Sequence, residues 1–219
     1  MSRDLTERPA GAPRVDPKHV LFALLGLLTL FALYTNERFI FDHTDPLWTY
    51  YFPVRWPLIP HGLAGAVVLC LGATQFSTRL RARRARLHRI FGRCYLIGVA
   101  IAAPVAIYIT FQHNPLPLRI AIVTQSLLWL LASGTAFYFV RHGNFVQHCE
   151  FMVRSYAITL IFVFDRVFDQ IPGVAALDAD TDPTVLWLCN VLAWVAPTYL
   201  LAWPALVRAK LKTSTAPVA

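Results

Sequence analysis

The chain has 219 residues, of which 57% are hydrophobic and only 15% are charged, and its formal net charge is +8. A water-soluble domain of this size covers its core with many more charges, so the composition excludes that class and indicates a polytopic membrane protein. The positive charge is concentrated in short connections beside apolar segments, which favours anionic lipid headgroups over nucleic acid as partners.

The chain divides into a polar start, six apolar segments and a basic end. Residues 1–17 are polar and carry charges of both signs, so we expect a disordered cytoplasmic tail there. A helix needs roughly 20 apolar residues to cross about 30 Å of hydrocarbon. The segments that fit are 19–36, 59–78, 92–112, 118–140, 150–171 and 184–207. The sequence therefore predicts an all-α integral membrane protein, with a six-helix transmembrane domain over residues 18–207 and a second tail over 208–219.

Arginine and lysine residues are divided unevenly between the connections. The connection after the second segment holds Arg79, Arg81, Arg83, Arg84, Arg86 and Arg89, with Arg93 at the start of the next helix. The last connection, residues 172–183, holds three aspartates and no cation. Because basic residues are retained on the cytoplasmic side, we expect both termini and the arginine-rich connection in the cytoplasm of a bacterial inner-membrane protein. The stretch Arg79–Arg93 is then a site for anionic lipid headgroups.

Small residues mark the second and third segments. They are Gly62, Gly65 and Gly72 in the second, and Gly92, Gly98 and Ala102 in the third. Small side chains let the backbones of membrane helices approach closely, so we expect these two helices to pack against each other at these positions.

Histidines precede the third and the fifth segments. Both of these segments start on the cytoplasmic side in the predicted topology, so His88 and His148 are expected at a similar depth. Two imidazoles on different helices could bind one haem iron, or another metal ion, with arginines neutralising acidic groups of the cofactor. The neighbouring residues with such roles are Arg89, Arg93, Arg154 and Met152. The alternative is that each histidine hydrogen-bonds a helix end or a lipid phosphate.

A second polar set is predicted on the opposite side of the membrane. It comprises His61, His113, Asp165, Arg166 and Asp169. An arginine flanked by two carboxylates can be a self-neutralising structural cluster. Alternatively, these residues line an outward polar cavity in which Arg166 receives an anionic or quinone-like ligand.

The order of these motifs resembles one bacterial family. His61 at the start of the second segment, the HRxxGR sequence of residues 88–93 and the HxxFMxRSYA sequence of residues 148–157 are similar to the uncharacterised membrane family called domain of unknown function 2306. The similarity covers roughly residues 58 to 207, and Phe151 stands where tryptophan is expected. This resemblance implies a membrane bundle without an established activity.

A looser similarity is to six-span cytochromes b that hold two haems. Those proteins pair histidines of spans two with four, and of three with five. His88 and His148 match the second pair, but the fourth segment has no interior histidine, so the resemblance implies one haem b at most. The resulting hypothesis is a membrane redox protein that exchanges electrons with a quinone or a membrane partner. Its rival is a non-enzymatic carrier, or an assembly or structural protein, with a cavity around Arg166.

Overall fold

The computed structural model describes residues 17–36, 38–40, 42–175 and 183–214, and every regular element within them is a helix. The six long helices are α1 (Pro17–Asn36), α3 (Arg55–Gln75), α5 (Ala85–His113), α6 (Leu116–Arg141), α7 (Phe145–Phe168) and α9 (Thr184–Ser214). The short helices are η1 (Arg38–Ile40), α2 (Pro46–Tyr51), η2 (Phe52–Val54), α4 (Thr78–Arg83) and α8 (Pro172–Ala175). The predicted all-α class is confirmed, and each of the six predicted segments is helical.

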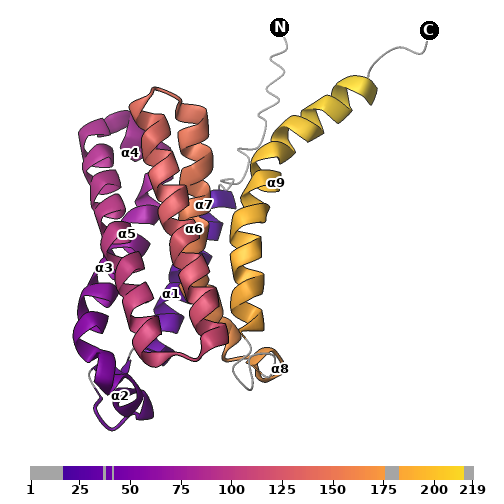
Figure 1. Cartoon of the computed structure of the whole chain (residues 1–219). Coiled ribbons are helices and arrows are strands. Elements are labelled where there is room, and N and C mark those ends of the chain that lie inside the picture. The colour runs from indigo at the N-terminus through magenta and orange to yellow at the C-terminus, as the bar shows by residue number, and fades with distance from the viewer. Residues whose placement is uncertain (1–16, 37, 41, 176–182, 215–219) are drawn as a thin grey trace, which may run out of the picture.

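The long helices form an antiparallel bundle with α7 at its centre (Figure 1). Along the chain, α3 packs on α5, α5 on α6 and α6 on α7, while α1, α3 and α9 also contact α7. One end of the bundle carries α4 and the α6–α7 turn, and we call it the α4 end. The opposite end carries α2 and α8, and we call it the α2 end.

Three helical stretches are long and apolar enough to cross a membrane: Pro46–Gln75, Ala85–His113 and Leu116–Arg141. Shorter apolar stretches occur in α1 and α9, at His19–Thr35 and Thr184–Tyr199. Helix α7 differs because it contains Glu150 and Arg154 near one end and Asp165 and Arg166 near the other. Its central position in the bundle places neighbouring helices around it, which is where ionisable groups are tolerated in a membrane protein.

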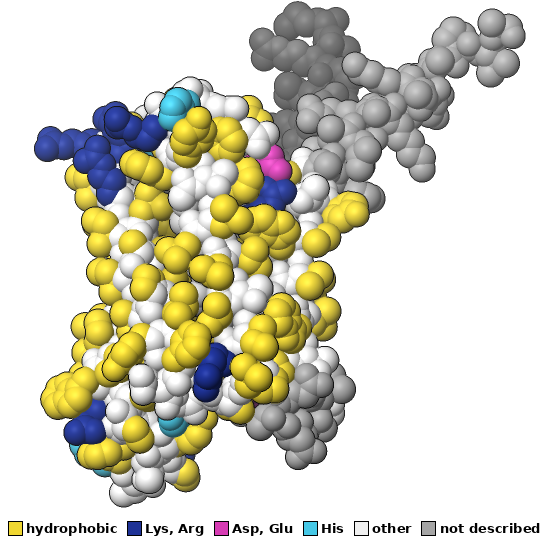
Figure 2. All heavy atoms as spheres, viewed as in Figure 1, with side chains coloured by type: hydrophobic (Ala, Val, Ile, Leu, Met, Phe, Trp, Pro, Cys, Tyr) yellow, Lys and Arg dark blue, Asp and Glu magenta, His cyan; other side chains and the backbone are white. Residues whose placement is uncertain are grey.

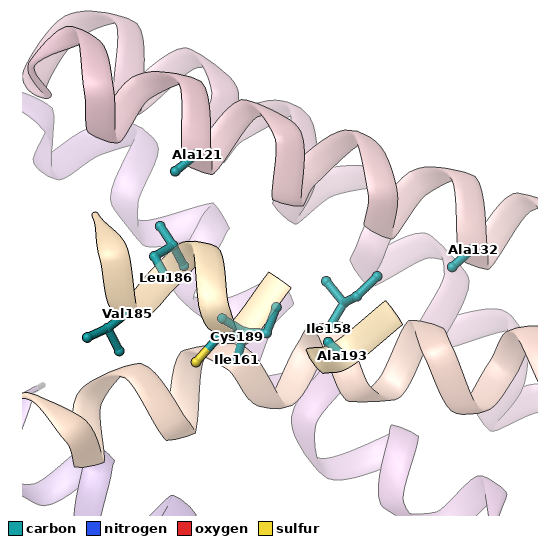
Figure 3. Close-up of a cluster of buried hydrophobic side chains, with 8 residues drawn as sticks. All are labelled: Ala121, Ala132, Ile158, Ile161, Val185, Leu186, Cys189 and Ala193. Atoms are coloured by element: carbon teal, nitrogen blue, oxygen red, sulfur yellow. The ribbon is translucent and has the colours of Figure 1, made fainter. Parts of the chain in front are cut away.

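Two apolar clusters hold the bundle together. One joins α6, α7 and α9 through Ala121, Ala132, Ile158, Ile161, Val185, Leu186, Cys189 and Ala193, which are drawn in Figure 3. The other joins α1, α3, α5 and α7 through Ala32, Val68, Tyr95, Val99, Tyr156, Leu160 and Val163. Because α7 contributes to both clusters, it fixes the two halves of the bundle relative to each other.

A buried hydroxyl network crosses the bundle between α5, α6 and α7. The Tyr95 hydroxyl lies 2.6 Å from Ser155 Oγ and 3.1 Å from Thr159 Oγ1, and Ser155 Oγ lies 2.7 Å from Ser133 Oγ. All four side chains are buried. Each hydroxyl therefore has a partner where water cannot supply one, as a buried polar group requires.

Removing the central hydroxyl of this network is expected to destabilise the bundle. Ser155→Ala leaves Ser133 without its partner on α7 and removes one of the two partners of Tyr95. The expected cost is about 1–3 kcal/mol in the free energy of unfolding. Denaturant unfolding in detergent micelles measures it, and Thr135→Ala, on the same helix as Ser133 but outside the network, is the control. Equal stability of Ser155→Ala and the control would contradict the network.

The helix boundaries place both predicted cofactor histidines inside first turns. Helix α7 begins at Phe145 rather than at residue 150, because the Asn144 side chain caps it by accepting a hydrogen bond from the Gln147 N–H. Helix α5 begins at Ala85 rather than at residue 92. At the other end of the chain, α9 continues to Ser214, so part of the tail predicted over 208–219 is helical. The tail predicted over 1–17 lies outside the described residues except for Pro17.

Candidate functional site

His148 is held by a neighbouring helix in one orientation. Its Nδ1 lies 2.9 Å from the backbone oxygen of Ala136 on α6, and the side chain is half-buried. A carbonyl oxygen can only accept, so Nδ1 carries the proton and donates it. The lone pair of the neutral ring is then on Nε2. A backbone carbonyl that orients a ring in this way is common behind histidines that bind metals or haem.

His88 lies at the same end of the bundle, in the first turn of α5. Its Nδ1 is buried and has no hydrogen-bond partner among the described residues. The ring is within electrostatic reach of His148 and of Arg81 on α4. The two histidines of the sequence motifs thus lie at the α4 end within electrostatic reach of each other, on helices that are not adjacent in the chain.

The predicted arginines differ in how available they are. Arg89 and Arg93 are exposed on α5. Arg154 is buried and points to α9: its Nη1 lies 2.8 Å from Glu150 Oε1 in an ion pair, and its Nη2 donates to Thr198 Oγ1 at 2.8 Å. Its charge is therefore engaged within the bundle.

Met152 packs against the apolar cluster that joins α1, α3, α5 and α7, so it has a packing role. Arg81 is the residue that sequence reasoning missed as a site residue. The sequence placed it only in the basic stretch that sets topology and attracts lipid headgroups, whereas in the structure α4 places it within electrostatic reach of His88. The signal for this placement is Ser77, which caps α4 by accepting from the Leu80 N–H at 3.1 Å.

The donor set at the α4 end is small. Within the described part of the chain, no group of three or more His, Cys, Asp or Glu side chains could hold a metal ion. Two imidazoles alone leave most positions around a bare transition metal unfilled. A haem brings four nitrogen ligands of its own, and proteins add only the axial ligands. The donor set fits haem better than a bare metal ion.

At the α2 end, His113 forms an aromatic cluster with two tyrosines that the sequence analysis did not assign to this site. Its ring centroid is 4.2 Å from that of Tyr50 and 5.6 Å from that of Tyr51, both on α2. Arg166 of α7 is within electrostatic reach of Tyr50, and its Nη1 lies 3.6 Å from Asp169 Oδ2. The aromatic stretch before α3 was the available signal for these tyrosines, but it is equally typical of membrane interfaces.

The other predicted members of the outer set lie differently. His61 Nδ1 lies 3.0 Å from the backbone oxygen of Ala102, so this ring is held between α3 and α5. Asp165 is half-buried on α7 beside Arg166. His113 thus contacts Tyr50, which is within electrostatic reach of Arg166. His61 is not part of this group, because its ring is held between α3 and α5.

The two carboxylates of the loop before α2 form hydrogen bonds within this region of the chain. Asp45 caps α2 by accepting from the Leu47 N–H at 3.0 Å, and Arg38 Nε donates to it at 3.1 Å. The hydroxyl and the backbone N–H of Thr44 both donate to Asp42, at 2.6 and 3.0 Å, and these bonds lower the pKa of the Asp42 carboxyl. Both carboxylates are engaged within the loop.

Comparison with known proteins gives one match. A family model described as "Predicted membrane protein (DUF2306)" matches residues 58–204, which is two thirds of the chain. No curated protein and no solved structure matches. The matched stretch begins before His61 and ends within α9, close to the limits that the sequence motifs indicated.

Proposed function

This chain belongs to the DUF2306 family of predicted membrane proteins, and we propose that it is a cytochrome-b-like redox protein that binds one haem b through His88 and His148. The observation that supports the proposal is that these two imidazoles lie at the α4 end within electrostatic reach of each other, although α5 and α7 are separated in the chain by α6. Ionisable groups in a membrane bundle usually mark a site, and two histidines at one end are more specific than either histidine alone.

The residues of the chain would position and neutralise the cofactor. The Ala136 carbonyl orients the His148 ring, so His148 would hold the haem through Nε2, and His88 would hold it from α5. Arg89 and Arg93 are the exposed cations that would pair with the haem propionates, and Arg81 is within electrostatic reach of His88. Arg154 was expected in this role, but it is paired with Glu150. When bound, haem supplies one-electron transfer, and the electron partner proposed is a quinone or another membrane component.

The topology proposed with this function has six spans and both termini in the cytoplasm of a bacterial inner membrane. Support comes from the arginine-rich stretch at the α4 end, since basic residues near membrane helices are retained inside. The haem would then lie near the cytoplasmic face.

Cysteine labelling in whole cells tests this orientation. In a variant whose four native cysteines are replaced by alanine, His43→Cys before α2 is expected to react with a membrane-impermeant maleimide in intact spheroplasts. Arg86→Cys at the start of α5 is expected to react only after the membrane is permeabilised, because it lies at the opposite end of the bundle. Labelling of Arg86→Cys in intact spheroplasts would show that the orientation is the reverse of the one proposed.

The experiment that tests the function is an absorption spectrum of the protein purified from haem-supplemented cells, with haem extraction and metal analysis of the same sample. A Soret band and close to one haem per chain support the proposal. A colourless preparation with less than a tenth of a haem per chain overturns it, and it favours the alternative.

The alternative is a non-enzymatic carrier or assembly protein with a polar site at the α2 end. The specific observation for it is the grouping of His113, Tyr50 and Arg166 from three different helices. In that function Arg166 would receive an anionic group.

A further inference from the structure

An open groove runs along the outer surface between α5 and α6. It has a volume of about 420 Å³, and its walls are mainly apolar. The residues that define it are Leu96 and Ala100 of α5, Leu130, Gly134 and Phe137 of α6, and Arg93 at its α4 end. A second hollow of about 350 Å³ shares Leu130 and Gly134 with it and continues over α6 towards Tyr138. The two hollows meet at Gly134.

The groove is open at Gly134, and packing against another helix does not require a glycine at this position. A Cβ atom at Gly134 would meet nothing within 4 Å, whereas at Gly98 it would meet the Val68 side chain at 2.5 Å. Glycines in membrane helices usually allow a second helix to approach, and Gly98 does so for α3. No described helix uses the space at Gly134, so the missing side chain leaves room at the lipid-facing surface.

The positive charge at one end of the groove indicates which class of ligand fits it. Arg93 lines the groove, and Arg89 lies one helical turn before it; both side chains are exposed. Figure 2 shows a group of basic side chains at the same end of the bundle, above a surface that is mostly hydrophobic. From Arg93 to Ala100 the groove extends about 10 Å along α5. An apolar channel with cations at one end matches an acyl chain with a negative headgroup.

We propose that the groove between α5 and α6 binds an anionic phospholipid, with one acyl chain against Gly134 and the phosphate paired with Arg93 and Arg89. The apolar part cannot select among lipids, since every phospholipid offers acyl chains. Selection comes from the headgroup, and near a membrane surface each arginine is worth about a fivefold change in affinity for an anionic lipid. The lipid site shares Arg89 and Arg93 with the proposed haem site but uses neither His88 nor His148, so lipid retention by a haem-free His148→Ala protein tests it separately from haem binding.

Native mass spectrometry of the full chain tests the site. The protein is delipidated in detergent, and phosphatidylglycerol or phosphatidylcholine of identical acyl chains is added back at equal concentration. We expect one phosphatidylglycerol to be retained at least tenfold more tightly than phosphatidylcholine. Arg93→Gln is expected to reduce this preference about fivefold, and Gly134→Leu is expected to abolish tight retention of either lipid by filling the groove.

Two matched variants control for charge and size. Arg79→Gln removes an exposed arginine of α4 that does not line the groove, and Gly62→Leu adds the same side chain at an exposed glycine of α3 where a Cβ also meets nothing within 4 Å. Both should keep the wild-type preference. Equal retention of the two phospholipids, an equal effect of Arg79→Gln, or a co-purified quinone that added phosphatidylglycerol does not displace would each overturn the proposal.

Discussion

Replacing His148 with alanine is expected to remove the Soret band of the purified protein, reducing bound haem more than tenfold. In the proposed site His148 is a haem ligand whose ring the Ala136 carbonyl already orients, so its replacement would remove a preoriented ligand. His88→Ala is expected to have a similar effect, because the proposed haem depends on both histidines. Absorbance of the oxidised and reduced protein, normalised to protein mass, measures the loss.

His142→Ala is the matched control for this experiment. His142 lies at the same end of the bundle, but it is exposed and its Nδ1 lies 2.8 Å from the backbone oxygen of Tyr138 in its own helix. Its replacement should leave the spectrum unchanged. Added imidazole should restore absorbance to the His148→Ala protein if the lost group acted as a ligand. A wild-type spectrum in both His88→Ala and His148→Ala would rule out these residues as ligands.

The long helices could be predicted from sequence because hydropathy reports them directly. Each predicted segment coincides with one helix, and the largest errors lie at the starts of α5 and α7 and at the end of α9. Hydropathy fails at the two starts because the first turns contain charged and polar residues, among them His88 and His148. The cap at Asn144 was a readable signal for the start of α7, since asparagine is a preferred capping residue.

The placement of the two histidines at one end of the bundle could also be predicted, because antiparallel helices place alternate starts at one end. The arginine partners of these histidines could not be predicted from the sequence. Arg154 faces α9 because of how α7 is rotated in the bundle, which no periodicity in the sequence fixes, although Glu150 one turn earlier was a signal for the ion pair. Arg81 comes within electrostatic reach of His88 through the short helix α4, which begins after the cap at Ser77.

The glycines of α3 show the same limit of prediction from sequence. Sequence reasoning treated Gly62, Gly65 and Gly72 alike as points of close helix approach. The structure distinguishes them: a Cβ atom at Gly62 or Gly65 meets nothing within 4 Å, whereas at Gly72 it would collide with the ring of Tyr156 and lie 2.9 Å from the ring of Tyr95. Composition shows that a residue is small, and only the packing of the neighbouring helices shows whether it has to be.

Substituting alanine for Gly72 is therefore expected to destabilise the bundle strongly. Both rings that it would meet are fixed: the Tyr95 hydroxyl lies in the buried network with Ser155, and Tyr156 donates to the backbone oxygen of Leu69 at 3.3 Å. Neither can move without breaking a hydrogen bond, which is buried for Tyr95 and partly buried for Tyr156. Overpacking of this kind costs about 1–3 kcal/mol, and the lost hydrogen bond adds to it. Unfolding of the purified protein in detergent micelles measures the change.

Gly65→Ala provides a control with the opposite sign. It is the same substitution in the same helix, but it meets open space, so the gain in helix propensity of up to about 1 kcal/mol is not offset by a collision. The double variant Gly72→Ala, Tyr156→Leu should recover part of the stability lost in Gly72→Ala, because a shorter side chain vacates the position that the new methyl group needs. If Gly72→Ala is as stable as Gly65→Ala, then α3 does not approach α5 and α7 as closely as the structure describes. The hydroxyl network and the shared end of His88 and His148, which depend on the same packing, would then lose their structural basis.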